Sequence, residues 1–599
     1  MERLHHNGVL VPPRYEAKGL RIWVRGVEVK LTPEQEEMAV AWAKKMGTPY
    51  VEDPVFASNF HRDFSKRLGI EVKPGDVDYS EVLREVIRER EYKVSLPREE
   101  RRRLAEERKR MREENKMLYG YAWVDGMRVE IGNYTVEPSS IFMGRGNHPK
   151  RGSWKEGPRE EDIELNLSPD APKPKGNWKG IVWDPDAMWI ARWRDKLTGK
   201  MKYVWLSESS YLKQRRELEK FEKARELGRN LERIKEHIFK NLSSEDPRRR
   251  KTATVCYLID ALKIRVGDEK DEDEADTVGA STLRPEHLTF NEDGTVTFDF
   301  LGKDSIRHLI TARLPEEVVR NLKEFMAEAR STLFEGIDSE RVSEFLNEVL
   351  PGLSAKVFRT FYATSAVEKE LKRREVGEND PKYLKKYIAV MANLEAAKIC
   401  NHKRAIPKTW ESSLQKKIEK IEKLKIEYKN SEKRIKEKLS ELEKRYNERL
   451  YKKEMMLNGE RKKIDEIKEM VEKRRGGGKN VKVLKEKLNR VRAKIETLKK
   501  TINKLKMERD VYRKRMLNRL DELKDRYKNR LEELRIQVEI QRETRDYNLA
   551  TSLKSYIDPR VYYEWGERIG YSWRDYYPAT LQRKFSWVEA KETWAGRPP

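Results

Sequence analysis

The sequence has few cysteines and histidines and no long apolar run. Its two cysteines, Cys256 and Cys400, lie in apolar contexts without a CxxC spacing, and its eight histidines form no HxxxH pair. Neither a disulfide framework nor a zinc site is therefore expected, and both thiols are expected to be buried and inert. No stretch approaches the ~18 apolar residues that cross a bilayer, and residues 1–17 lack the apolar segment of a secretory signal. An intracellular protein without a membrane partner is expected.

The sequence also lacks a GxxxxGK[ST] stretch, which excludes an ATPase of the P-loop type. The acidic residues between Asp268 and Asp276 have no apolar anchor among them. They are typical of a solvated loop rather than a magnesium site. No metal and no cofactor are expected.

Charge is what the sequence has in excess. Lys and Arg number 130 against 104 Asp and Glu, a net charge of +26, and charged residues make up 39% of the chain against 37% hydrophobic residues. A strongly basic chain favours a polyanionic partner such as DNA, RNA or an acidic membrane surface. The length of 599 residues predicts several domains, and the high charged fraction predicts at least one long solvated helix.

The patterns predict an α+β fold in four stretches. Residues 1–208 mix short strands with helices, including a basic helix over 97–116 that has almost no apolar stripe. Residues 209–405 are mostly helical, with one strand hairpin around the turn 291–294. Residues 406–545 have a different pattern, the heptad repeat described below. Residues 546–599 are rich in Tyr and Trp and too few to fold alone, so they are expected to dock on the preceding domain.

The third stretch predicts a long antiparallel coiled-coil hairpin. Its second half carries a heptad seam of apolar residues: Leu484, Leu488, Val491, Ile495, Leu498, Ile502 and Leu505. The first half repeats the pattern more loosely, and Gly476, Gly477 and Gly478 lie between the halves. Glycine allows the chain to reverse there, so two helices of about 60 residues, each about 90 Å long, should pair antiparallel. Because residues 546–599 are expected to dock on the domain before the hairpin, the hairpin is predicted to be an insertion within one domain.

Five residues outside the hairpin form a set suited to phosphodiester chemistry: Arg265, Lys303, Arg359, His402 and Tyr556. Two guanidinium groups can hold the non-bridging oxygens of a phosphate and neutralise a pentavalent transition state. A histidine can donate to the same oxygens, a lysine can protonate a leaving alkoxide, and a phenol can be the nucleophile.

The phrases around these residues are similar to motifs of the eukaryotic-type DNA topoisomerase IB family and occur in the family's order. They are GRGNHPKRG at 144–152, ADTVGASTLRPEHL, FDFLGKDSIR, AKVFRTFYATS, CNHKRAIPKTW and TSLKSYIDPR. The resemblance runs from HNGVLVPPRYE at His6 to QRKFSWV at Gln582, which is nearly the whole chain.

The resemblance implies a role for each member of the set. Tyr556 would attack a DNA phosphate to give a 3′-phosphotyrosine, Arg265, Arg359 and His402 would stabilise the transition state, and Lys303 would protonate the leaving 5′-oxygen. Strand rotation would then relax supercoils of both signs without ATP.

The resemblance also implies how the chain holds its substrate. The expected fold is a two-lobed clamp around double-stranded DNA, formed by a monomer. The DNA contacts implied are Arg145, Asn147, His148, Lys150, Asp304 and Ser555.

The sequence departs from the family's usual pattern at several places. Met143 stands where an arginine is common, and Ser555 replaces the asparagine that usually precedes the nucleophile, which predicts weak trapping by camptothecin-type inhibitors. The hairpin looks longer than the usual linker, and the long charged nuclear-targeting tail is absent. An archaeal relative is therefore expected, acting on DNA in the cytoplasm or nucleoid.

Two alternatives remain. Tyrosine recombinases share the Arg, Lys, His and Tyr set, but they usually have a histidine where Lys356 stands here, and their nucleophile follows the last histidine closely. A non-enzymatic architectural DNA-binding protein would explain the charge and the coiled coil. It would leave the five residues of the set unexplained.

Overall fold

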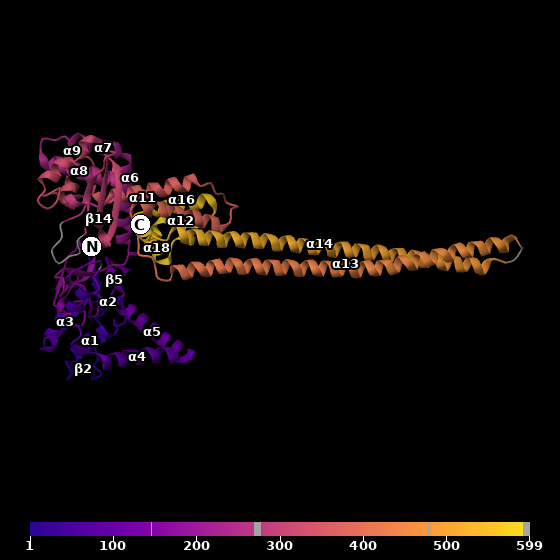
Figure 1. Cartoon of the computed structure of the whole chain (residues 1–599), viewed down its shortest axis with the longest axis horizontal. Coiled ribbons are helices and arrows are strands. Elements are labelled where there is room, and N and C mark those ends of the chain that lie inside the picture. Colours follow the sequence, from indigo (N-terminus) through magenta and orange to yellow (C-terminus); the bar gives the residue numbers. More distant parts are fainter. Residues whose placement is uncertain (145, 269–276, 477–479, 591–599) are drawn as a thin grey trace. The chain divides into compact units, whose positions relative to one another are not determined.

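The computed structural model describes residues 1–144, 146–268, 277–476 and 480–590. These residues divide into two compact units. One unit contains residues 1–379, 391–404 and the described residues from Tyr547 onward, and the other contains 380–390 and 405–546. The fold is α+β and mainly helical, with a long pair of helices, as the sequence predicts (Figure 1). Among the described residues, no helix combines the length and apolar character needed to cross a membrane.

The N-terminal part of the first unit contains small sheets and five helices. The helices are α1 (Pro33–Ala43), α2 (Pro49–Glu52), α3 (Pro54–Leu68), α4 (Ser80–Ser95) and α5 (Arg98–Tyr119). The strands are β1 (Leu4–His6), β2 (Arg21–Val24), β3 (Val27–Lys30), β4 (Val77–Asp78), β5 (Tyr121–Val124), β6 (Met127–Glu130), β7 (Ser140–Ile141), β8 (Trp154–Lys155), β9 (Ile163–Asn166), β10 (Gly180–Val182), β11 (Trp189–Arg194) and β12 (Met201–Trp205). Helix α5 buries no residue, which confirms the solvated basic helix.

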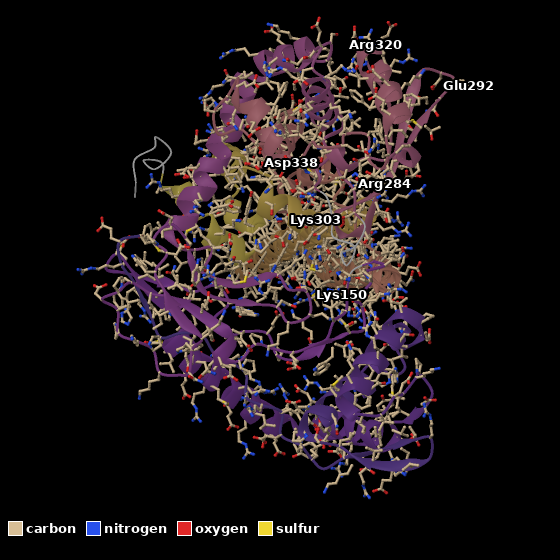
Figure 2. All side chains as sticks on the ribbon, turned by 90° about the vertical axis from the view of Figure 1, so that its left-hand side faces the viewer. Lys150, Arg284, Glu292, Lys303, Arg320 and Asp338 are labelled. Atoms are coloured by element: carbon tan, nitrogen blue, oxygen red, sulfur yellow. The ribbon has the colours of Figure 1, made fainter. Side chains whose placement is uncertain are left out.

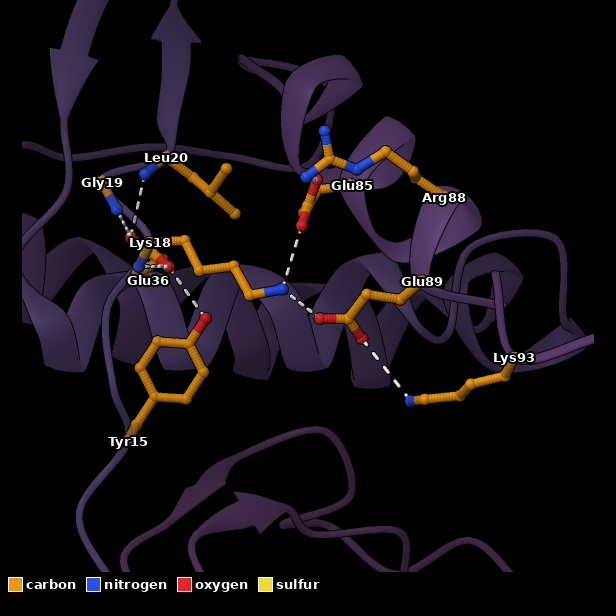
Figure 3. Close-up of polar contacts among 9 residues, drawn as sticks. All are labelled: Tyr15, Lys18, Gly19, Leu20, Glu36, Glu85, Arg88, Glu89 and Lys93. Atoms are coloured by element: carbon orange, nitrogen blue, oxygen red, sulfur yellow. Dashed lines mark hydrogen bonds and ion pairs between the residues drawn. The ribbon is translucent and has the colours of Figure 1, made fainter. Parts of the chain in front are cut away.

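A buried carboxylate fixes the chain that enters this region. Glu36 on α1 is fully buried and accepts hydrogen bonds from the Tyr15 hydroxyl at 2.8 Å and from the main-chain N–H groups of residues 18–20 at 2.7–2.9 Å (Figure 3). The Lys18 ammonium then pairs with Glu85, at 2.9 Å, and with Glu89, both on α4. The segment before β2 therefore joins α1 to α4.

The remainder of the first unit is helical around one three-stranded sheet. Its helices are α6 (Tyr211–Arg229), α7 (Leu231–Asn241), α8 (Pro247–Leu262), α9 (Glu316–Glu328), α10 (Ser339–Asn347), α11 (Ala355–Arg373) and the C-terminal half of α12 (Lys382–Ile399). The sheet has the order β13 (Leu288–Phe290), β14 (Thr295–Gly302) and β15 (Ile306–Arg313). The expected hairpin at 291–294 is confirmed, and β15 adds a third strand to it that the sequence analysis did not name. In β15 alternate residues are half-buried, and Ser305 takes a positive φ of 57° in the turn before it.

The second unit contains the coiled-coil hairpin. Helices α13 (Trp410–Gly476) and α14 (Lys482–Glu543) lie side by side in Figure 1. Their antiparallel register is set by a stack of Tyr428 on Tyr527, with ring centroids 4.1 Å apart, and by the ion pair of Lys506 with Glu454 at 3.6 Å. The seam residues Ile495, Ile502 and Leu505 are buried against Leu450 and Leu457. The predicted hairpin is therefore confirmed, although residues 477–479 of its glycine turn lie outside the described residues.

The C-terminal helices belong to the first unit and pack on its preceding helices, as their aromatic content predicts. They are α15 (Leu549–Ser555), α16 (Pro559–Ile569), α17 (Trp573–Tyr576) and α18 (Ala579–Lys584). Phe221 of α6 lies against both Phe585 and Trp587, with its ring centroid 6.3 Å from each of theirs. Both cysteines are buried, and burial raises the pKa of each thiol, which agrees with the inert role expected for them.

Candidate active site

Arg359 lies in the first turns of α11, the helix-start position that the sequence predicts. Its side chain is buried, and its guanidinium donates to two main-chain carbonyls, that of Lys263 at 3.0 Å and that of Cys400 at 2.7 Å. Its Nε has no hydrogen-bond partner among the residues that the structure describes. A buried N–H without a partner costs free energy unless a ligand accepts from it. Arg359 is thus held by two main-chain carbonyls, and its Nε–H has no recorded partner among the described residues.

His402 follows α12 and lies against Arg359. Its Nε2 is 3.4 Å from Arg359 Nη2, and its Nδ1 is 2.6 Å from the hydroxyl oxygen of Ser552. Burial, together with the charges of Arg359 and Arg265, lowers the pKa of His402 to about 3. The imidazole is therefore neutral near pH 7 and can donate one hydrogen bond, but it carries no positive charge.

Tyr556 directly follows the last residue of α15. Its ring centroid lies 5.0 Å from that of His402 and 5.2 Å from the Arg359 guanidinium carbon. The main chain around it is held by α11, where the Thr364 hydroxyl donates to the Tyr556 carbonyl at 3.2 Å and accepts from Asp558 N–H at 3.1 Å. The half-buried phenol is therefore placed beside two polar groups that can bind an anion.

Arg265 and Lys303 make no recorded contact with Tyr556. Arg265 is half-buried in the segment after α8, close enough that its charge lowers the pKa of both His402 and His308. Lys303 is exposed and follows the last residue of β14. Figure 2 shows Glu292, in the turn before β14, at the edge of the view, and Lys303 near its middle.

His308 is a residue of this site that the sequence analysis missed. It pairs with Phe300 across β14 and β15, and the two rings stack with centroids 5.0 Å apart. Burial and the charges of Arg359, Arg265 and Lys403 lower its pKa to about 4. Hairpin register could have placed it opposite Phe300, because the turn between the strands is short.

A buried ion pair fixes the segment after Tyr556. Asp558 caps α16 and accepts from the Arg560 guanidinium at 2.8–3.0 Å, and both side chains are fully buried. Arg560 also pairs with Glu222, and Arg225 lies 3.2 Å from Asp558. Both partners come from α6, so this helix anchors the chain immediately after the tyrosine.

The GRGNHPK loop between β7 and β8 contains most of the other predicted DNA contacts. Asn147 is exposed, and the His148 ring lies 4.9 Å from that of Phe142. The ammonium of Lys150, a residue labelled in Figure 2, donates to the Leu197 carbonyl at 3.2 Å.

The same loop lies against the turn that contains Lys303, because a methyl on Gly146 would collide with the Ser305 hydroxyl. Met143, at the start of the loop, packs on the N-terminal core. Ser555 is half-buried, and its carbonyl accepts from the Lys220 ammonium at 3.2 Å. Arg145 and the side chain of Asp304 lie outside the described residues.

Comparison with known proteins identifies the family. Residues 1–206 match the model of the eukaryotic DNA topoisomerase I DNA-binding fragment, residues 209–439 match that of its catalytic core, and residues 528–595 match a C-terminal topoisomerase domain. The chain is 32% identical to DNA topoisomerase 1 of Candidozyma auris over 99% of its length and 83% of the relative's. The chain belongs to the eukaryotic DNA topoisomerase I family.

For two other members of the family, either the sequence identity or the share of the relative's length that is covered is lower. DNA topoisomerase 1 beta of Arabidopsis thaliana is 37% identical over 71% of this chain, which spans only 47% of the length of that plant protein. DNA topoisomerase 1 of Homo sapiens is 29% identical over 98% of this chain and 70% of the human protein.

Family membership decides between the earlier alternatives. The matches cover the N-terminal stretch, the catalytic core and the C-terminal segment that contains Tyr556, so neither a tyrosine recombinase nor an architectural protein describes the chain. These relatives are eukaryotic proteins, and the comparisons do not support the archaeal origin expected from the sequence.

Proposed function

We propose that this chain is a type IB DNA topoisomerase that cleaves one strand of duplex DNA through Tyr556, permits rotation and reseals the strand. The observation that carries the proposal is the meeting of Arg359, His402 and the Tyr556 ring, which come from three segments far apart in the sequence. Each group has a distinct use at a phosphodiester, and a guanidinium such as that of Arg359 suits the oxygens of a phosphate.

The proposed reaction is a transesterification that needs no added energy. Tyr556, as the phenolate after its proton passes to solvent, forms a bond to phosphorus while the bond from phosphorus to O5′ breaks. Lys303 gives a proton to the leaving O5′. Resealing is the reverse: the 5′-hydroxyl attacks, Lys303 takes the proton back, and the phenolate leaves. One phosphoester bond replaces another, so the covalent intermediate conserves the energy for resealing.

Three side chains would stabilise the transition state. Arg359 and Arg265 would bind the non-bridging oxygens and neutralise the developing charge. His402 would act beside them as a neutral donor, since its pKa of about 3 keeps it uncharged. A neutral donor beside the Arg359 guanidinium can approach a phosphate oxygen without adding a third repelling cation.

DNA binding would involve two parts of the first unit, the loop 144–151 and the residues beside the cleaved bond. In the loop 144–151, Asn147, His148 and Lys150 would hold backbone phosphates, and Arg145 would approach the minor groove. Asp304 and Ser555 would lie beside the cleaved bond. Phosphate contacts of this kind position the duplex without reading its sequence.

The proposed domains follow from these roles. Residues 1–208 would form a cap and 209–405 the catalytic core of a two-lobed clamp, and 546–599 would complete the core. The hairpin 406–545 would tether the C-terminal segment and slow the rotating duplex through its Lys and Arg side chains. We propose a monomer that is associated with DNA in the cell.

A relaxation assay tests the proposal. Positively and negatively supercoiled plasmids should both relax in EDTA without ATP, because the proposed chemistry uses only side chains. Tyr556→Phe should bind DNA and relax neither plasmid. A requirement for a divalent cation or for ATP, or relaxation by Tyr556→Phe, would contradict the proposed function.

A further inference from the structure

Ser552 joins two parts of the site that the proposed reaction requires. It lies on α15 and is fully buried. Its hydroxyl oxygen is 2.6 Å from His402 Nδ1, and its carbonyl accepts from the N–H groups of Tyr556, at 2.9 Å, and Ile557, at 3.2 Å. Among the described residues, His402 is the one recorded hydrogen-bond partner of this hydroxyl. No other recorded hydrogen bond among the described residues therefore competes with the one between this hydroxyl and the imidazole.

The main chain of His402 is fixed independently of its ring. Its N–H donates to the Ala397 carbonyl at 2.9 Å, and its own carbonyl accepts from Asn548 N–H at 2.7 Å. The ring is thus held with Nδ1 toward Ser552 and Nε2 toward Arg359. Only Nε2 faces the place where Arg359 would hold a phosphate.

A neutral imidazole has a single N–H, and the partner of one ring nitrogen decides which nitrogen has it. If the Ser552 hydroxyl donates to Nδ1, the hydrogen is on Nε2, which can donate to a phosphate oxygen. If the hydroxyl accepts from Nδ1, then Nε2 presents a lone pair, which would repel the anion. In the structure without DNA, the second arrangement suits the 3.4 Å contact of Nε2 with Arg359 Nη2, because a guanidinium can only donate. A phosphate oxygen that accepts from Arg359 would replace that contact, and the buried hydroxyl hydrogen then has Nδ1 in reach as its acceptor.

We propose that Ser552 is a positioning residue that acts through His402: by donating to Nδ1, it keeps the hydrogen on Nε2, where it stabilises the transition state of strand cleavage. The proposal rests on the proposed function, because it requires a phosphate at this site. It assigns no direct contact between Ser552 and DNA.

A double-mutant cycle separates this role from a structural one. Ser552→Ala should lower the single-turnover rate of covalent-adduct formation by about 10- to 100-fold, because one transition-state donor is worth about 100- to 1,000-fold and the imidazole retains part of its correct tautomer. DNA affinity should not change. His402→Gln places an amide N–H near the position of Nε2, and that hydrogen does not depend on Ser552. In the His402→Gln background, Ser552→Ala should therefore slow the reaction by less than about twofold.

The matched control is Ser168→Ala. Ser168 is also buried and donates to the Leu4 carbonyl at 3.1 Å. It has no recorded contact with Arg359, His402 or Tyr556, and its loss should leave the cleavage rate unchanged. Equal slowing by Ser552→Ala in both backgrounds would show that Ser552 only supports the fold around Tyr556 and would overturn the proposal. So would a wild-type rate in Ser552→Ala. Tyr556→Phe in the same assay tests the proposed function separately, because an adduct that persists there refutes the nucleophile whatever Ser552 does.

Discussion

Gly302→Ala tests whether the turn between β14 and β15 positions Lys303 for proton transfer. A methyl group on Gly302 would lie 2.7 Å from both Cδ2 and Nε2 of His308. The imidazole has little room to retreat, because it stacks on Phe300 with only 2° between the ring planes. The added methyl must therefore displace either the ring or the turn.

The expected size of the effect follows from this geometry. Ordinary van der Waals contact begins at 3.4 Å, so the displacement needed is about 0.7 Å. A misplacement of about 1 Å at a reacting group can slow a reaction about 100-fold. We expect Gly302→Ala to slow single-turnover cleavage by about 10- to 100-fold and to leave the Kd for DNA unchanged, because the substitution removes no charge.

The assay uses a duplex oligonucleotide whose cleaved 5′-hydroxyl strand is short enough to dissociate, so that the covalent adduct accumulates. Gly180→Ala is the control, because a methyl there meets no atom within 4 Å. Removing the His308 ring in the double variant Gly302→Ala, His308→Ala should relieve the collision and restore most of the rate that Gly302→Ala loses. Cleavage by Gly302→Ala at the wild-type rate, or no recovery relative to His308→Ala alone, would refute the reasoning.

Three further predictions concern pH, salt and stability. The pKa of His402 is lowered to about 3 from its ordinary 6.5. At pH values between these two, the unfolded chain therefore has one more bound proton than the folded chain. Stability should therefore fall as pH drops below 6.5, and less steeply in His402→Gln, as measured by urea denaturation at a series of pH values. Lys150→Gln should reduce the log–log salt dependence of DNA binding by about one with unchanged site choice, whereas a sequence-selective loss would mean that Lys150 reads bases. Arg560→Met should lower the free energy of unfolding by about 3–5 kcal/mol. It removes the buried guanidinium and leaves the Asp558 carboxylate, among the described residues, with Arg225 at 3.2 Å as its recorded ion-pair partner and with the main-chain N–H of residue 560 as a donor. A loss below about 1 kcal/mol in urea denaturation would show that the pair is not an anchor.

Features with a local periodic signal could be predicted from the sequence. The coiled-coil hairpin follows from heptads such as Ile495 and Ile502, since each residue's environment there depends on neighbours three and four positions away. The hairpin at 291–294 follows from its turn residues in the same way. Strand β15 was not predicted. Its alternating half-buried and exposed residues begin directly after a turn of only a few residues, so no clear break in the sequence marks where the strand starts.

The residues of the site also fall into two groups, those that a local sequence pattern predicts and those that it does not. Arg359, His402 and Tyr556 were predicted together, because the phrases around them resemble family motifs. Ser552, Thr364 and the buried pair of Asp558 and Arg560 were not predicted. Their contacts join α15 to α11, α6 and the end of α12, and no spacing in the sequence indicates which of many serines or threonines will lie there.

The most direct test of the central claim is to identify the residue that becomes linked to DNA. The enzyme would be incubated with the accumulating oligonucleotide, denatured and digested, and the peptide attached to DNA would be sequenced by mass spectrometry. We predict that a single tyrosine, Tyr556, is joined to the 3′-phosphate, that the other strand end has a free 5′-hydroxyl, and that Tyr556→Phe yields no adduct. A linkage at any other residue, or a 5′-phosphate link, would contradict the account.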